Sequence, residues 1–123
     1  MMTEISVEAP AAEPACREFP LPQDGDFPVG GFVVRHSGQV TAFVNRCPHT
    51  GAPLNWKPDD FLTADGQLIQ CSLHGALFDP ADGRCLRGPC AGDRLQQLPL
   101  RYADGRWLVD AAQAGNSLRS GGK

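Results

Sequence analysis

The sequence GFVVRHSGQVTAFVNRCPHTG, residues 31–51, carries the pattern that decides the fold. Two segments within it, Gly31–His36 and Gln39–Asn45, are rich in β-branched and aromatic residues, and apolar side chains recur at alternate positions, which is typical of β-strands. Ser37-Gly38 between them is a two-residue turn signal. The stretch therefore predicts a β-hairpin that leads directly into a loop containing a cysteine and a histidine.

The rest of the chain shows the same alternation of short apolar runs and turns. Asp-Gly pairs mark turns at residues 65–66, 82–83 and 104–105, and apolar residues flank each of them. Leu95–Tyr102 alternates in the manner of a strand, and Trp107–Asp110 follows it after the third turn. No segment has convincing helical periodicity, so the sequence predicts an all-β domain of short strands.

Length and composition fit one domain of this kind. The chain has 123 residues, of which 14 are Gly and 11 are Pro, so it is short for two cores and rich in turn-forming residues. Residues 1–15 are rich in Ala, Glu and Pro and are expected to be flexible. The folded domain is expected to cover residues 16–110, beginning with a short strand near Cys16–Phe19, and residues 111–123 are expected to form a flexible tail.

Charge and cysteine content narrow the class of protein. The formal net charge is −3, which argues against nucleic-acid binding through phosphate neutralisation. No secretory signal and no run of about 20 apolar residues is visible, so we expect a cytoplasmic protein without a membrane partner. The odd count of five cysteines favours, in a reducing compartment, metal or redox chemistry over a disulfide framework.

Two short motifs each combine a thiol with an imidazole. They are CPHTG at residues 47–51 and CSLHG at residues 71–75, each in a loop beside a predicted strand. A lone Cys or His is usually a packing or surface residue, but two such pairs at metal-ligand spacing indicate a metal centre. Thiolate and imidazole ligands suit zinc and also the iron of an iron–sulfur cluster, and the spacing alone does not decide between them. The four candidate ligands are Cys47, His49, Cys71 and His74.

The residues around these motifs resemble one family. CPHTGAPL at 47–54 and CSLHGALFD at 71–79 are similar to the cluster-binding loops of the Rieske iron–sulfur family, and Gly88-Pro89 is similar to its proline loop. The resemblance covers residues 16–110. It implies an all-β domain of small antiparallel sheets that holds one 2Fe–2S cluster between two loops at one tip.

In this family two cysteines bind one iron and two histidines bind the other. The resemblance therefore implies that Cys47 and Cys71 ligate one iron and that His49 and His74 ligate its neighbour. Two neutral imidazoles in place of thiolates raise the reduction potential relative to an all-Cys cluster. One departure from the family is the 21 residues between His49 and Cys71, a few more than expected. We expect the excess in a surface extension at Asn55–Gln67, called the spacer below.

Four positions indicate the low-potential, ferredoxin-like branch of the family. The high-potential Rieske proteins of respiratory complexes have an additional disulfide between the two loops, and Ser and Tyr hydroxyls donate to cluster sulfurs. Ala52 and Leu73 stand at the disulfide positions here, and Ala76 and Phe78 stand at the hydroxyl positions. The resemblance thus implies a one-electron carrier of lower potential, which passes electrons from a reductase to an oxygenase or another redox enzyme.

Two other functions compete with an electron carrier. A Rieske oxygenase needs a second iron held by two His and one carboxylate, but only His36 remains after the cluster ligands are assigned. This favours an electron-transfer protein or oxidoreductase component over a catalyst acting alone. The other alternative is a structural Cys2His2 zinc module without redox activity, which would be colourless when purified.

The remaining candidate residues have packing or docking roles. Cys16, Cys85 and Cys90 are expected to pack without chemistry, and His36 is expected to be solvent-exposed. Electrons are expected to leave beside the two histidine ligands, where a partner would dock. The expected docking residues are Leu54 and Leu73 beside the cluster and Arg84 and Arg87 at the rim.

Overall fold

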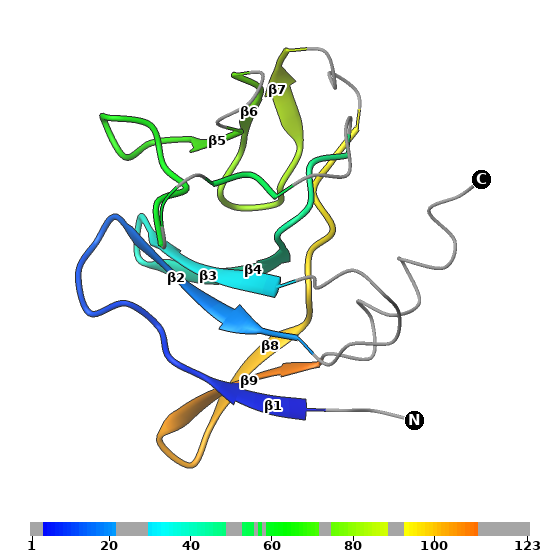
Figure 1. Ribbon diagram of the computed structural model, residues 1–123. Coiled ribbons are helices and arrows are strands. Elements are labelled where there is room, and N and C mark those ends of the chain that lie inside the picture. The colour runs from blue at the N-terminus through cyan, green and yellow to red at the C-terminus, as the bar shows by residue number, and fades with distance from the viewer. Residues whose placement is uncertain are drawn as a thin grey trace.

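The computed structural model of the chain describes residues 4–21, 30–48, 53–55, 57, 59–71, 75–88 and 93–110. Within these residues the chain forms nine β-strands and no helix (Figure 1), so this part contains no helix that could span a membrane. The strands form three antiparallel sheets of three strands each, in the orders β1-β9-β8, β2-β3-β4 and β5-β6-β7. The predicted fold class, all-β with small antiparallel sheets, is confirmed.

The predicted hairpin forms the centre of the molecule. β3 (Gly30–His36) pairs with β4 (Gln39–Val44), and β2 (Ala15–Pro20) pairs with the other edge of β3. The turn has positive φ at both Ser37 and Gly38, 51° and 77°. Two positive φ values are what a two-residue hairpin turn needs to match the twist of its strands.

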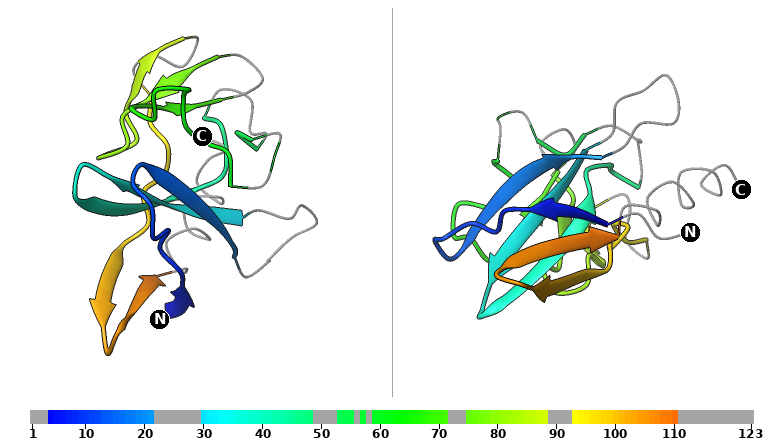
Figure 2. Two further views of the ribbon diagram at one scale, coloured as in Figure 1. Left: turned by 90° about the vertical axis from the view of Figure 1, so that its left-hand side faces the viewer. Right: turned by 90° about the horizontal axis from the view of Figure 1, so that it is seen from below.

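Both faces of this central sheet are buried, which explains the unbroken apolar run at Phe32–Val34. Phe32 and Val34 contribute to one core and Val33, on the opposite face, to another. Accordingly, the β5-β6-β7 sheet and the β1-β9-β8 sheet lie on opposite sides of the central sheet (Figures 1 and 2). The first core consists of Cys16, Phe32, Val34, Phe43, Cys47, Leu54, Phe61, Ile69, Cys71, Ala76, Phe78, Cys85 and Leu95. The second core consists of Val7, Phe19, Leu21, Val33, Ala42, Val44, Leu98 and Val109.

The structure contains a strand that the sequence analysis did not predict. β1 (Glu4–Val7) lies within residues 1–15, where we expected no regular structure. It pairs with β9 (Arg106–Asp110), and Val7 is buried in the second core. Four residues carry little periodicity of their own, and the partner strand lies at the other end of the chain, so no local pattern marks this strand.

The strand predicted at Leu95–Tyr102 is shorter than expected. β8 covers Leu100–Ala103, whereas residues 96–98 pair with the edge of β4 through two backbone hydrogen bonds. Pro99, which has no N–H to donate, separates the two pairings. As a result, Tyr102 lies beyond the core and is 61% exposed.

The third sheet lies next to the second predicted ligand motif. Its strands are β5 (Ile69–Gln70), β6 (Leu77–Phe78) and β7 (Cys85–Arg87). The first loop, defined here as residues 47–54, follows β4, and the second loop, residues 71–76, connects β5 to β6. The fold therefore places both predicted ligand motifs next to strands of the first core.

Candidate metal centre

The two cysteines of the predicted centre lie in one buried core. Cys47 in the first loop is 1% exposed and Cys71 in the second loop is 0% exposed, and both belong to the first core. Their predicted companions His49 and His74 lie outside the described residues. The structure thus brings two thiols from separate loops into one apolar environment, and the ligand role of all four residues stays a prediction.

The surroundings of these thiols fit an iron–sulfur cluster. Among the described residues, the polar or charged residues that are buried are Asn45 and Asp110, so no buried cation or carboxylate competes inside the first core. Cys47 and Cys71 are the predicted ligands in the described part of the chain, which contains no group of three or more His, Cys, Asp or Glu side chains that could bind a metal. Thiolates shielded from water by apolar side chains are suitable ligands for cluster iron.

Hydrogen bonds close both loops at their bases. In the second loop the Cys71 N–H donates to the Ala76 carbonyl at 2.9 Å, and the Gly75 N–H donates to the Cys71 carbonyl at 2.9 Å. In the first loop the Leu54 N–H donates to the side-chain Oδ1 of Asn45 at 2.8 Å. Asn45 was not predicted as a site residue, although its position directly after a buried strand and two residues before Cys47 is a signal for one.

A third segment packs against the second loop at Gly88. Its φ is +110°, and a Cβ atom there would lie 2.9 Å from the Cα of Ala76. Only glycine fits such a close approach at this φ. The contact supports the predicted proline loop, although Pro89 itself lies outside the described residues.

The structure describes some of the residues predicted to set the reduction potential or to contact a redox partner. Ala76 and Phe78 are fully buried in the first core with Cys71, and neither side chain has a hydroxyl group. Leu54 is also 0% exposed, which corrects its predicted docking role: its side chain fills the first core instead of facing a partner. Ala52 and Leu73 lie outside the described residues.

The other residues considered from the sequence have mostly structural positions. Cys85 is buried in the first core, as predicted, whereas Cys90 lies outside the described residues. His36 is half-buried instead of exposed, because its Nε2 lies 3.2 Å from Oε1 of Gln67 in the spacer. Arg84 and Arg87 are exposed.

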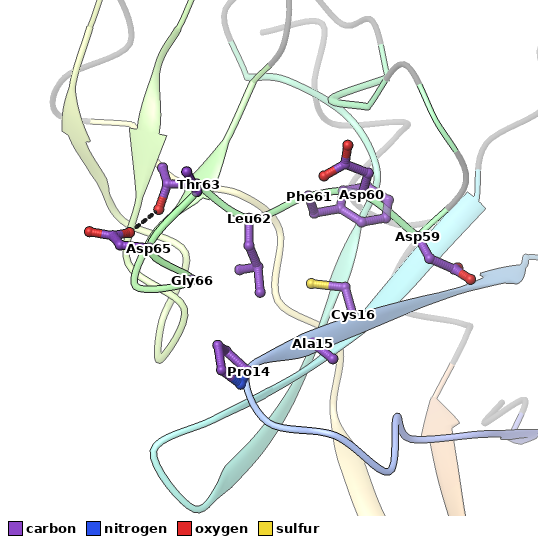
Figure 3. Close-up of a pocket in the computed structure, with 11 residues that line it drawn as sticks. Pro14, Ala15, Cys16, Asp59, Asp60, Phe61, Leu62, Thr63, Asp65 and Gly66 are labelled. Carbon is purple, nitrogen blue, oxygen red and sulfur yellow. Dashed lines mark hydrogen bonds between the residues drawn. The ribbon is translucent and has the colours of Figure 1, made fainter.

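Cys16 lines a pocket at some distance along the chain from the predicted ligands. The pocket has a volume of about 530 Å³ and is formed by residues 14–16 and 59–66. The Cys16 thiol is buried and points into it between Leu62 and Pro14 (Figure 3). Burial, reinforced by the carboxylates of Asp59 and Asp60, raises the pKa of this thiol from 9.0 to about 12. A thiol that keeps its proton is a poor ligand and nucleophile, which agrees with the packing role predicted for Cys16.

This pKa predicts a loss of stability in alkali. The unfolded Cys16 thiol ionises near pH 9.0 and the folded one near pH 12, so the thiol's contribution to the free energy of unfolding is complete below the lower pKa and is lost as the pH rises toward the upper one. We expect the wild type to lose about 1.4 kcal/mol per pH unit more than Cys16→Ala in this window. Urea denaturation of both proteins across the window is the measurement, and parallel curves would contradict the prediction.

Comparison with known proteins identifies the family. The family model of the Rieske [2Fe-2S] domain matches residues 22–99, and the chain belongs to this family. A curated relative, the oxygenase component of chloroacetanilide N-alkylformylase from Rhizorhabdus wittichii, is 40% identical over 113 residues. That match covers 85% of this chain, which spans only 28% of the relative's length.

Solved structures show the same fold in two kinds of protein. The ferredoxin of carbazole 1,9a-dioxygenase from Nocardioides aromaticivorans IC177 aligns with a TM-score of 0.64 and 25% identity, over 88% of this chain and 97% of the ferredoxin. The terminal oxygenase of carbazole 1,9a-dioxygenase from Novosphingobium sp. KA1 aligns with a TM-score of 0.68 and 22% identity, over 87% of this chain and 29% of the oxygenase. The second likeness is one of fold.

Family membership settles the kind of cofactor and its chemistry. The chain carries a Rieske 2Fe–2S cluster, a group that accepts and releases one electron at a time. The alternative of a structural zinc module is not supported by these comparisons.

Proposed function

We propose that this chain transfers electrons from a reductase to an oxygenase or another redox enzyme in the cytoplasm. The observation that carries the proposal is the alignment with a dioxygenase ferredoxin over nearly the whole length of both chains. The test is to reduce the purified protein with a flavin reductase from its host and to follow reoxidation by candidate oxygenases. Absence of reduction by any reductase, with the cluster intact, would contradict the proposal.

For the cofactor we infer that Cys47 and Cys71 bind one iron and that His49 and His74 bind the other. The support is the burial of both cysteines in the first core and their position on two separate loops. Histidine ligands supply neutral imidazoles, which makes the site less negative and easier to reduce than an all-Cys site. The apolar side chains around the two cysteines exclude water from the thiolate side.

We place the docking surface for a redox partner at this end of the molecule, on and beside β7. Leu86 in β7 is 44% exposed, and exposed Arg84 and Arg87 flank it. Among the described residues neither arginine forms a salt bridge. An exposed apolar side chain between two cations suits a partner with an apolar patch and an acidic rim, and such redox encounters are small and transient.

The docking surface predicts a charge-reversal effect on rate. We expect Arg87→Glu to slow reduction by the reductase about tenfold at low ionic strength, because it removes electrostatic attraction, and the difference should shrink as salt is added. Arg106→Glu is the matched control, since it makes the same charge change on β9, across the central sheet from the cluster. Stopped-flow reduction over a range of ionic strength is the measurement. Equal slowing in both variants would mean that net charge, and not this surface, governs association.

The side chains at positions 76 and 78 predict a low reduction potential. Without a hydroxyl at Ala76 or Phe78, we expect a value in the lower part of the Rieske range of roughly −150 to +300 mV. Phe78→Tyr should raise the potential, because a donated hydrogen bond favours the more negative reduced state. Phe61→Tyr adds the same hydroxyl elsewhere in the first core and should leave the potential unchanged. Protein-film voltammetry decides, and a wild-type value near the upper limit would contradict the prediction.

A second candidate is a Rieske domain that works as part of an oxygenase component. The observation that favours it is the 40% identity with an oxygenase component. Size-exclusion chromatography of the protein from its host separates the two candidates: a carrier elutes apart from the oxygenase, whereas a built-in domain elutes with it. In both cases the cluster and its proposed ligands are the same.

A further inference from the structure

The side chain of Asn45 bridges the two ends of the first loop. Asn45 is only 9% exposed and precedes Cys47 by two residues. Its Oδ1 accepts a hydrogen bond from the Leu54 N–H at 2.8 Å, and its Nδ2 donates to Oδ1 of Asn55 at 2.9 Å. Its own N–H donates to the Gly30 carbonyl at 2.8 Å, which fixes Asn45 to β3. Asn45 therefore connects three parts of the chain. Its backbone N–H is bonded to the central sheet, and its side chain links the start of the first loop to the end of that loop.

A second set of bonds holds this amide in place. Nδ2 of Asn55 donates to Oε2 of Glu18 at 2.9 Å and to the Lys57 carbonyl at 2.7 Å. Glu18 and Asp59 then exchange hydrogen bonds: the Asp59 N–H donates to Oε2 of Glu18 at 2.8 Å, and the Glu18 N–H donates to Oδ1 of Asp59 at 2.7 Å. The spacer is thus tied to β2, and through Asn55 it orients the Asn45 amide.

The two loops differ in how they are closed. The bonds at the base of the second loop join backbone groups of its own residues, Cys71, Gly75 and Ala76. Between described residues of the first loop, the closing bond uses the Asn45 side chain as its acceptor. A loop closed by backbone groups keeps its closing bonds whatever the side chains are, whereas the bond from the Leu54 N–H is lost when the Asn45 side chain is removed.

We propose that Asn45 is a positioning residue for the iron–sulfur site. Through its bond to Leu54 it fixes the first loop around Cys47, and Asn55 and Glu18 keep its amide in the orientation that makes this bond. The inference rests on the proposed ligand role of Cys47. It explains why a polar side chain is buried at the edge of the first core, where the oxygen and the nitrogen of its amide each have a hydrogen-bond partner.

Four variants test the proposal. Asn45→Ala removes both side-chain bonds, and Asn45→Asp keeps an acceptor for Leu54 while losing the donor to Asn55. Asn55→Ala leaves the Asn45–Leu54 bond without its support. Thr63→Ala is the matched control, because it removes a spacer hydrogen bond, to Asp65, that is separate from Asn45.

The first measurement is the loss of the cluster to a chelator, together with its electron-paramagnetic-resonance spectrum. We expect Asn45→Ala to lose iron on the order of tenfold faster than wild type and to show shifted g-values, as for other residues that orient ligands. Asn55→Ala should lose iron at an intermediate rate, Asn45→Asp should restore much of the retention, and Thr63→Ala should match wild type. If Asn45→Ala does not fold, the comparison of Asn55→Ala with Thr63→Ala decides in the same way.

The second measurement does not depend on the cluster. Amide hydrogen exchange at Leu54 should be on the order of tenfold faster in Asn45→Ala than in wild type, and slow in Asn45→Asp. A wild-type protein without a Rieske signal would contradict the proposed function. A wild type with that signal, in which Asn45→Ala and Thr63→Ala show equal iron loss and equal Leu54 exchange, would overturn the role of Asn45 alone.

Discussion

In a His74→Ala variant we expect little or no intact Rieske cluster. Removing one imidazole leaves one iron short of a ligand, and alanine offers no replacement donor. Because metal binding also contributes to folding in small metal domains, the melting temperature should fall together with the cluster content. Iron and sulfide analysis and the electron-paramagnetic-resonance spectrum of the purified protein are the measurements.

Cysteines outside the proposed ligand set provide the controls for this experiment. Cys85→Ala removes a thiol from the first core, and Cys90→Ser changes one near the predicted proline loop; both should keep iron at the wild-type level. A His74→Ala protein with a normal Rieske spectrum would contradict the proposed ligand set.

Substituting Gly88 should destabilise the protein strongly, because a side chain there is excluded both by the backbone angle and by a backbone neighbour. Its φ is +110°, and a Cβ atom would approach the Ala76 Cα to 2.9 Å. Relief requires movement of the second loop or of the segment that packs on it. We expect Gly88→Ala to lower the free energy of unfolding by about 3 kcal/mol and to broaden the Rieske spectrum. Guanidinium denaturation monitored by fluorescence gives the free energy of unfolding, and the electron-paramagnetic-resonance spectrum of the native protein shows the broadening.

Gly105→Ala is the control that distinguishes the strain of a positive φ from a steric clash with a neighbouring residue. Its φ is +79°, but a Cβ atom there would have nothing within 4 Å. Gly105→Ala should therefore cost only the strain of a left-handed alanine, about 1 kcal/mol, and leave the spectrum unchanged. Equal losses in the two variants would show that Gly88 is required for its φ and not for its contact with Ala76.

The parts of the fold that were predictable are those with a local signal. The hairpin of β3 and β4 combines alternating apolar residues with Ser37-Gly38, and both features act over a few residues. β1 has no such signal, because what makes Glu4–Val7 a strand is pairing with β9 at the other end of the chain. At Leu95–Tyr102 the alternation was real, but the sequence does not show that Pro99 divides the segment between two sheets.

At the site, the sequence indicated residue types better than their environment. The repeated Cys and His spacing predicted a metal centre without knowledge of the fold, because few side chains bind metals at such short intervals. The choice of a 2Fe–2S cluster over zinc came from the resemblance of the flanking residues to the Rieske family. The orientation of Leu54 could not be read in the same way, since a loop has neither the two-residue nor the 3.6-residue period that relates position to burial. The role of Asn45 was not predicted, because this residue ends the predicted strand Gln39–Asn45, and a polar side chain where a strand meets a loop is common.

The pairing of β1 with β9 has a consequence for how such a domain can be used. Glu4 and Asp110, near the two ends of the described chain, are opposite each other in one ladder, and this sheet lies across the central sheet from β5-β6-β7 (Figure 1). A polypeptide can therefore enter and leave the domain at a single edge without passing the metal loops. The same architecture can then serve as a separate carrier or be built into a longer chain.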